Sequence, residues 1–138
     1  MTPKTKKSKK IQVPFDYRII KSFEDACKNE NADPSLLPVV SLLSEEHRKS
    51  IIAYYKLIII FKAINNGWTP DYSKGNQYKY YPYFWVLSSG FAFDGTDYLC
   101  TDTTTTCGSR LCTDTSEKSL YIAKQFEDLY RDYLLYLK

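Results

Sequence analysis

The chain has 138 residues, of which 43% are hydrophobic and 25% are charged. This is enough for one globular core and too little for a second full domain. The formal net charge is +3, but five lysines lie within the first ten residues, where there is no acid. The remaining residues hold fourteen basic and sixteen acidic side chains, so a mildly acidic body follows a strongly basic arm.

The N-terminal arm, residues 1–19, joins this basic segment to an extended one. Almost nothing apolar precedes Ile11, so we expect residues 1–10 to become ordered only on a partner. The alternation from Ile11 to Tyr17, around Pro14, predicts an extended segment or an edge strand. The sequence leaves open whether the arm is a solvated tail or docks on protein or on nucleic acid. The predicted partner contacts in the arm are Lys4, Lys6, Lys7, Lys9, Lys10, Val13 and Phe15.

The body, residues 20–138, is predicted to be a single domain that begins with a short helix. Ser22 followed by an acid at Asp25 is typical of a capped helix start, and this helix is expected to end near residues 29–31. A connection bounded by Pro34 and Pro38 follows, and its leucines are expected to pack against the body.

A longer helix is predicted from Glu45 to about Asn66, with Ser44 as its cap and Gly67 as its terminator. Apolar residues form two adjoining stripes along it and leave only a narrow polar face, which predicts the central, most buried helix. His47 falls in the first turn, where an exposed or capping histidine is expected rather than a catalytic one.

The second half of the body begins with a predicted small antiparallel sheet. From Tyr83 onward, bulky residues alternate in the manner of a strand, and Gly90 precedes a turn. Asp94-Gly95 predicts a second turn, and residues 98–100 a further strand. The threonine-rich run 101–106 is β-branched but hardly apolar, which predicts an exposed strand or hairpin tip.

A final amphipathic helix is predicted from Ser116 to about Leu137. The order of elements indicates an α+β fold, in which two long helices and a short one pack on one face of the sheet. A basic extended N-terminal arm completes this architecture.

No pattern in the chain is typical of catalysis. The glycines are isolated, and phosphate-loop, dinucleotide-binding and serine-elbow motifs are missing from the sequence, so we expect no enzyme activity and no cofactor. The four cysteines contain no C-x-x-C pair and lie far from His47, so we expect no metal and interpret them as small buried hydrophobes. The apolar run Leu57 to Phe61 is too short to span a membrane, and no signal peptide is expected.

The aromatic run from Tyr78 to Trp85 is the strongest candidate for a binding surface. Tyrosine and tryptophan are enriched at protein interfaces, so we expect this run to contact a protein partner. Lys74 and Lys79 are interleaved with it, which leaves open a platform for stacking single-stranded nucleic acid. The absence of lysine and arginine from Phe84 to Thr106 weakens that alternative. The predicted contacts are Tyr78, Tyr80, Tyr81, Tyr83 and Trp85.

Four further residues are predicted to have structural roles. They are Gly67, Trp68, Gly108 and Arg110. The two glycines are expected at turns. Arg110 is either a surface charge or, as we expect, the partner of a nearby acid in a salt bridge, for which Asp94, Asp97 and Asp114 are the candidates.

Several motifs in order give the chain a family resemblance. They are Ser22 to Cys27, Tyr55-Lys56-Leu57, Asn66 to Asp71, Tyr78 to Pro82, Gly108 to Cys112 and Gln125-Phe126. Together they resemble a family of small proteins in tailed phages and prophages of gut Bacteroidetes, crAss-like phages included, usually described as virion structural proteins. The resemblance covers residues 20 to 135, without the basic arm.

The resemblance implies a non-enzymatic component of the phage particle, assembled in the host cytoplasm. An auxiliary capsid protein or head-fibre component that anchors through its arm is the implied role, in contact with capsid, portal or tail proteins and with its own copies. The alternative is a cytoplasmic nucleic-acid-binding accessory protein that uses the arm and the aromatic run. No contact with a membrane is expected.

Overall fold

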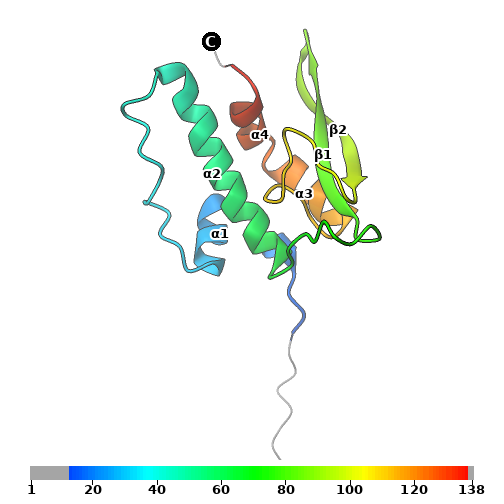
Figure 1. The fold of residues 1–138 in the computed structure, drawn as a ribbon. Helices are drawn as coiled ribbons and strands as arrows, with labels where there is room; N and C mark the ends of the chain where they lie inside the picture. The colour runs from blue at the N-terminus through cyan, green and yellow to red at the C-terminus, as the bar shows by residue number, and fades with distance from the viewer. Residues whose placement is uncertain (1–12, 137–138) are drawn as a thin grey trace, which may run out of the picture.

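A computed structural model gives the structure of residues 13–136 (Figure 1). These residues form a short 3-10 turn, η1, four helices and one antiparallel hairpin, which confirms the predicted α+β class. The elements are η1 Tyr17–Ile19, α1 Phe23–Asn29, α2 Glu45–Asn65, β1 Lys79–Leu87, β2 Gly90–Leu99, α3 Ser116–Gln125 and α4 Glu127–Leu134.

Helix α1 begins where the sequence predicts. The Ser22 hydroxyl accepts a hydrogen bond from the Asp25 amide at 3.1 Å, and the Asp25 carboxylate accepts one from the Lys21 amide at 3.0 Å. The first bond satisfies an amide that the first helical turn leaves unpaired, and the second fixes the residue before the cap. The apolar face of α1 packs on α2, where the Phe23 ring meets the edge of Tyr55 at 6.3 Å between centroids.

Helix α2 is the central helix, as predicted, and its second half is buried on all but one side. Ser44 stands at its N-terminus but makes no side-chain capping bond. At the other end, Asn66 and Gly67 both adopt left-handed φ values, of 45° and 88°, which turn the chain out of the helix. The buried residues of α2 are Ala53, Leu57, Ile60, Phe61, Ala63, Ile64 and Asn65.

The C-terminal helix differs from the prediction, because the chain forms two helices instead of one. Phe126, with φ −120° and ψ 29°, interrupts the helical backbone, and Thr115 rather than Ser116 caps α3. The break has a packing cause. It lets α3 lie against the base of the hairpin while α4 packs along α2, with Phe126 itself buried in the core.

The hairpin also differs from the prediction in its extent. Strand β1 begins at Lys79 rather than Tyr83, and β2 runs without a turn through Asp94-Gly95. Tyr83 pairs with Gly95 and Phe84 with Phe93, so Asp94 is the extra residue of a β-bulge. The threonine-rich run 101–106 is exposed at most positions but forms no strand.

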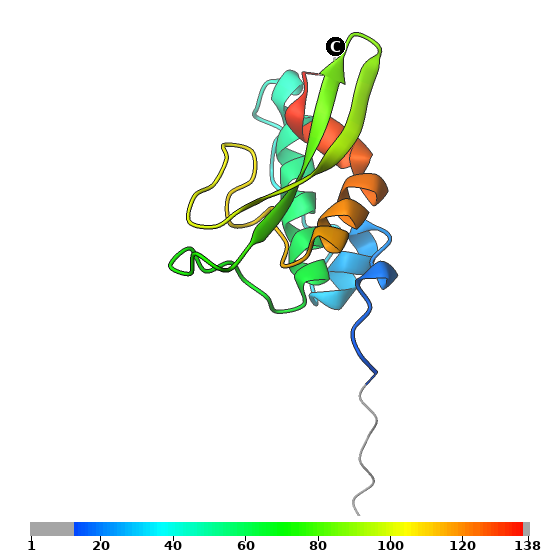
Figure 2. The ribbon, with the colours of Figure 1, turned by 90° about the vertical axis from the view of Figure 1, so that its right-hand side faces the viewer.

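The hairpin stands on α3 and α4, and its far end extends beyond them (Figures 1 and 2). An isolated bridge holds the base, where Tyr80 and Thr113 exchange backbone hydrogen bonds of 2.9 and 2.8 Å. The N-terminal segment is tied to α3 by the Tyr121 hydroxyl, which donates to the Ile20 carbonyl at 2.8 Å. Among residues 13–136, no helix is both long and apolar enough to cross a bilayer.

Candidate interaction surface

The tip of the hairpin is apolar and solvent-exposed. Trp85, Val86 and Leu87 have exposed fractions of 55%, 62% and 54%. The neighbouring residue Phe84 points the other way and stacks on Phe91, with 4.6 Å between ring centroids. The predicted alternation therefore holds only from Tyr83 to Trp85. Val86 shares the face of Phe84 but is exposed, so the end of the hairpin carries apolar side chains in solvent on both faces.

Phe84 fixes the hairpin to the helices. Its ring lies 4.8 Å from that of Tyr130 on α4 and 6.0 Å from that of Phe93 on β2. Tyr130 in turn meets the ring of Phe61 on α2, at 6.5 Å. This chain of aromatic contacts runs from the hairpin into the core, so the exposed tip is carried by a well-anchored strand.

A second aromatic group lies at the base of the hairpin. Tyr78 and Tyr98 have ring centroids 4.6 Å apart, and Tyr80 lies 6.3 and 6.0 Å from them. Tyr78 and Tyr98 are about half exposed. Tyr98 is a member that the aromatic run did not reveal, because it reaches the group by pairing with Tyr80 across the hairpin.

The predicted aromatic surface is thus two separate patches rather than one. Tyr78 and Tyr80 belong to the basal patch, and Trp85 to the tip. Tyr83 lies between them over Gly95, where an added Cβ would stand 3.0 Å from its hydroxyl. Tyr81 is half-buried, and burial raises the pKa of its hydroxyl.

Lys79 is buried, which the sequence did not indicate. Its exposed fraction is 1%, and its ammonium donates hydrogen bonds to the carbonyls of Asp71 and Gln77, at 2.8 and 2.9 Å, and to that of Cys100. The same group lies 4.9 Å from the centroid of the Tyr72 ring. Lys79 therefore joins the loop after α2 to both strands and is not free to contact a phosphate.

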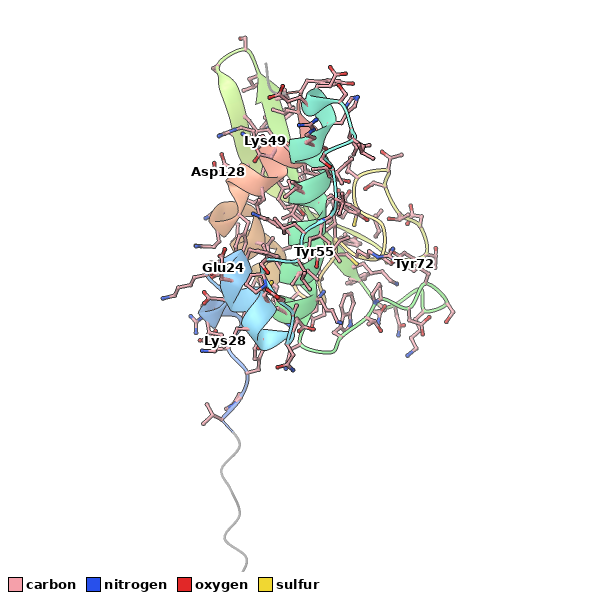
Figure 3. The ribbon with its side chains drawn as sticks, turned by 90° about the vertical axis from the view of Figure 1, so that its left-hand side faces the viewer. Glu24, Lys28, Lys49, Tyr55, Tyr72 and Asp128 are labelled. Atoms are coloured by element: carbon pink, nitrogen blue, oxygen red, sulfur yellow. The ribbon has the colours of Figure 1, made fainter. Side chains whose placement is uncertain are left out.

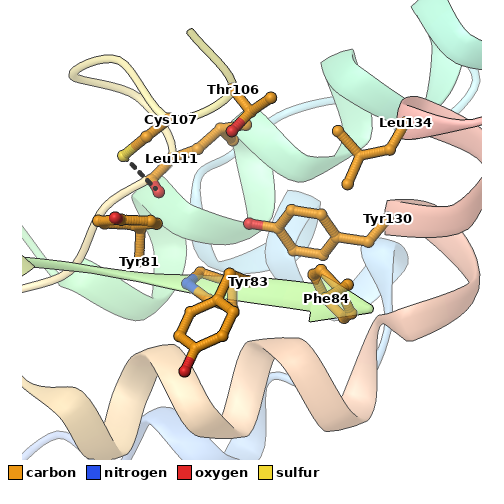
Figure 4. Close-up of a pocket in the computed structure, with 9 residues that line it drawn as sticks. Tyr81, Tyr83, Phe84, Thr106, Cys107, Leu111, Tyr130 and Leu134 are labelled. Carbon is orange, nitrogen blue, oxygen red and sulfur yellow. Dashed lines mark hydrogen bonds between the residues drawn. The ribbon is translucent and has the colours of Figure 1, made fainter. Parts of the chain in front are cut away.

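A small cleft lies beside the hairpin, between β1, the 106–111 loop and α4 (Figure 4). It has a volume of about 200 Å³. Tyr130, whose pKa burial raises well above its ordinary value, forms one wall, and the thiol of Cys107 lies opposite it. The cleft residues are Tyr81, Pro82, Tyr83, Phe84, Thr106, Cys107, Leu111, Tyr130 and Leu134.

The predicted arm contacts lie mostly outside the described residues, because Lys4, Lys6, Lys7, Lys9 and Lys10 precede residue 13. Val13 has an exposed fraction of 85%, whereas Phe15 is half-buried and packs against the core. Residues 13–16 form no strand, and Tyr17 begins η1. Of the two predicted alternatives, an extended segment or an edge strand, the edge strand does not form in the described part, which Phe15 holds on the body.

The four predicted structural residues have different surroundings. Gly67 and Gly108 have left-handed φ values of 88° and 61°, as turn glycines require. Trp68 is half-buried after the α2 terminator, and its amide donates to the Asn65 carbonyl at 3.0 Å.

The predicted salt bridge of Arg110 is wrong. Arg110 is exposed and forms no ion pair with any of the described residues. The candidate acid Asp114, just before the Thr115 cap of α3, pairs instead with Lys118 in the first turn of that helix, at 2.9 Å.

A further apolar surface lies on the connection between α1 and α2. Leu36, Val39 and Leu42 have their side chains largely in solvent, so the expected packing of the Leu36-Leu37 segment on the body is wrong. Prolines at 34 and 38 keep this connection extended and away from the core. No sequence pattern distinguishes these leucines from packed ones.

The side of the molecule that faces away from the hairpin, shown in Figure 3, carries this connection and also charged side chains. Glu24 and Lys28 on α1, Lys49 on α2 and Asp128 on α4 are exposed there with mixed charge. His47 is also exposed, beside the Glu46 carboxylate at 3.3 Å, as predicted for a first-turn histidine. Residues 13–136 contain no cluster of three or more metal-ligating side chains.

Comparisons of the chain with protein-family models, with curated proteins and with solved structures found no match.

Proposed function

We propose that this chain is a non-enzymatic structural protein of a bacteriophage particle that works through protein–protein contacts. The observation that carries the proposal is the hairpin tip, where Trp85, Val86 and Leu87 are more than half exposed on an anchored strand. Exposed aromatic and aliphatic side chains grouped in this way favour burial against a partner protein. The phage assignment rests on the sequence resemblance.

The charge around the tip favours a protein partner over a nucleic acid. No lysine or arginine occurs from Phe84 to Thr106, while Asp94 and Asp97 lie exposed on β2. Contacts with a phosphate backbone need basic side chains at the same surface. The tip therefore suits the surface of another virion protein or of a second copy of this chain.

The arm supplies the second contact of the proposed role. Its five lysines all lie within residues 1–10, whereas the rest of the chain carries a slight excess of acidic side chains. In the particle, the arm anchors the protein on the shell as an auxiliary capsid protein or head-fibre component, and the hairpin contacts neighbours. Capsid, portal or tail proteins are the proposed partners, and any contact with nucleic acid is made by the arm.

The test is the copy number of this protein in phage particles purified on a density gradient. Quantitative mass spectrometry gives its abundance relative to the major capsid protein. A copy number comparable to that of the capsid protein is expected for shell decoration or fibre attachment. A small copy number, as for a protein that forms a single ring, would instead indicate a role at the portal or tail. Absence from the particles rejects the proposal.

The alternative, a cytoplasmic nucleic-acid-binding accessory protein, has less support. The basal patch of Tyr78, Tyr80 and Tyr98 offers stacking surfaces, but Lys79 is buried beneath it and only Lys74 stands exposed in the adjoining loop. A steep salt dependence of single-stranded DNA affinity that is lost on Tyr80→Ala would support this alternative. Weak binding that depends only on the arm would not.

A further inference from the structure

The cleft between β1, the 106–111 loop and α4 has a buried floor and an exposed rim. Pro82 is buried, and Leu111 and Tyr130 have exposed fractions of 1% and 4%. Tyr83 and Thr106, which also line the cleft, are exposed. A small molecule that enters past the rim would therefore lose its contact with water at the floor.

The hydroxyl of Tyr130 is a hydrogen-bond donor without a partner at this floor. Figure 4 shows the Tyr130 ring reaching from α4 toward the 106–111 loop, with the hydroxyl at its leading end. The one side-chain hydrogen bond among the cleft residues joins Cys107 to Leu111, and the Tyr130 hydroxyl donates to no other of residues 13–136. Buried polar groups are nearly always hydrogen-bonded, so this hydroxyl indicates an acceptor that the folded chain does not supply.

The lining favours a neutral ligand that contains a ring. The cleft residues include no Asp, Glu, Lys, Arg or His, so a charged group placed there would lose water without gaining a counter-ion, which is costly. The side chains of Tyr81, Phe84 and Tyr130 offer aromatic surfaces to another ring. The volume of about 200 Å³ suits one substituted six-membered ring, since a cavity of about 150 Å³ holds benzene.

We infer that this cleft binds a small neutral ring compound that carries a carbonyl oxygen, and that the Tyr130 hydroxyl donates a hydrogen bond to this oxygen. The inference rests on the shape of the cleft, its uncharged lining and the unpaired hydroxyl. It does not depend on the phage assignment or on the proposed contacts of the arm and the hairpin tip, so it stands or falls separately from them.

A bound ligand would contact both the hairpin and the helix that anchors it. Tyr83 and Phe84 belong to β1, and Tyr130 and Leu134 belong to α4, so the ligand would lie between these two elements. A molecule that binds the folded chain and not the unfolded one stabilises the folded state. The thermal midpoint of the protein should therefore rise with the concentration of a suitable ligand.

Two probes of nearly the same shape test the inference. Acetophenone carries a carbonyl oxygen beside its ring, whereas α-methylstyrene carries a methylene group in the same place. Each probe is titrated into the full-length protein, and proton–nitrogen NMR spectra report both the affinity and the location of binding. We expect acetophenone to cause saturable shifts at the amides of Thr106, Cys107 and Leu111, together with a rise in the thermal midpoint.

Tyr130→Phe removes the donor and keeps the ring. This variant should bind acetophenone about two- to tenfold more weakly than the wild type and should bind α-methylstyrene with unchanged affinity. Leu134→Trp should block the cleft to both probes. Leu129→Trp, at another half-buried position of α4 that does not line the cleft, should leave the binding of both probes unchanged.

Three outcomes would overturn the inference. In the first, neither probe binds, and the Tyr130 hydroxyl is left to bond with water alone. In the second, Tyr130→Phe affects the two probes equally, so the hydroxyl does not recognise the carbonyl oxygen. In the third, the shifts lie in another part of the protein. The comparison between wild type and Tyr130→Phe stays decisive even if Leu134→Trp fails to fold.

Discussion

At the residue scale, the unusual feature is a lysine that acts as a core residue. The Lys79 ammonium donates hydrogen bonds to backbone carbonyls of the loop after α2 and to that of Cys100, which follows β2. One charged group therefore connects this loop to both strands at the base of the hairpin. Backbone carbonyls in a buried loop need donors, and no other residue type reaches them with three hydrogens on a flexible stem.

Replacement of this lysine should therefore destabilise the fold. Lys79→Met keeps the apolar stem but leaves buried carbonyls without donors, so we expect the free energy of unfolding to fall by about 3 kcal/mol. Urea unfolding monitored by tryptophan fluorescence measures the change. The matched control is Lys74→Met in the same loop, which removes only an exposed ion pair with Asp71 and should change stability by less than about 0.5 kcal/mol. Equal effects of the two variants would show that the carbonyl contacts are unimportant.

Tyr130 should make the fold sensitive to alkaline pH. Burial raises the pKa of Tyr130 above its ordinary value of 10.0 in the folded protein, whereas the unfolded chain ionises near that value. The stabilisation is thus fully present below pH 10 and is lost as the pH rises above it, by about 1.4 kcal/mol per pH unit for one proton.

Tyr130→Phe removes this single ionisation. The variant should lose less stability than the wild type between pH 10 and pH 11, while the two proteins should differ by less than about 1 kcal/mol at pH 8. Urea midpoints at the three pH values provide the comparison. The same loss of stability in both proteins at high pH would assign the alkaline sensitivity to other groups.

At the scale of elements, the hairpin combines an anchoring face with a free one. Phe84 contacts Tyr130, Phe91 and Phe93, whereas its neighbour Trp85 is more than half exposed. A two-stranded hairpin is marginally stable in isolation, so the anchoring face is what keeps the tip in place.

Neighbouring substitutions separate these two faces. Phe84→Ser should lower the free energy of unfolding by about 2 kcal/mol or more, because it opens a gap against α4. Trp85→Ser should change it by less than about 0.5 kcal/mol and yet reduce incorporation into phage particles. Urea unfolding and particle copy number measure the two effects. If Trp85→Ser proves as destabilising as Phe84→Ser, the tip contributes to the fold and is not a free binding surface.

The predictable elements are those whose ends are decided locally. The start of α1 depends on Ser22 and Asp25, and the end of α2 on Gly67, all within one turn of the residues they control. The break at Phe126 was not predictable, because the helical pattern continues through it, and at Asp94 the turn signal of Asp94-Gly95 predicted a turn where the strand continues through a bulge. Packing of α3 and α4 on different partners decides the first, and pairing across the hairpin accompanies the second.

The candidate site shows the same limit. Trp85 could be identified from the aromatic run, but the separation of Tyr78 and Tyr80 from it depends on the strand pairing that brings Tyr98 to them. The burial of Lys79 depends on backbone carbonyls of the preceding loop and of Cys100, 21 residues further on, and a sequence pattern does not show where backbone carbonyls point. The sequence identified the aromatic run as a candidate binding surface, whereas tertiary contacts divide that run into two patches.

At the scale of the whole molecule, the point where residue 13 leads into the body and the hairpin tip lie at opposite ends. The chain enters the body beside η1 and α1, and the hairpin tip stands at the far end in both views (Figures 1 and 2). A protein held by its N-terminus would therefore present the tip away from the anchor, where it can reach a neighbouring protein. Such a head-to-tail arrangement is heterologous and closes into a ring or continues along a surface, depending on the rotation between copies.

Removal of the arm should separate anchoring from folding. A protein that lacks residues 1–10 keeps Phe15, Ile20 and the rest of the described core, so its thermal midpoint should match that of the full chain. Its copy number in phage particles should fall at least tenfold, because the proposed shell contact is gone. A second variant with serine at Lys4, Lys6, Lys7, Lys9 and Lys10 keeps the length of the arm but not its charge. Loss of incorporation in both variants assigns anchoring to the lysines. Loss in the truncation alone assigns anchoring to the backbone and apolar side chains of the arm. Full incorporation of both variants contradicts anchoring through the arm.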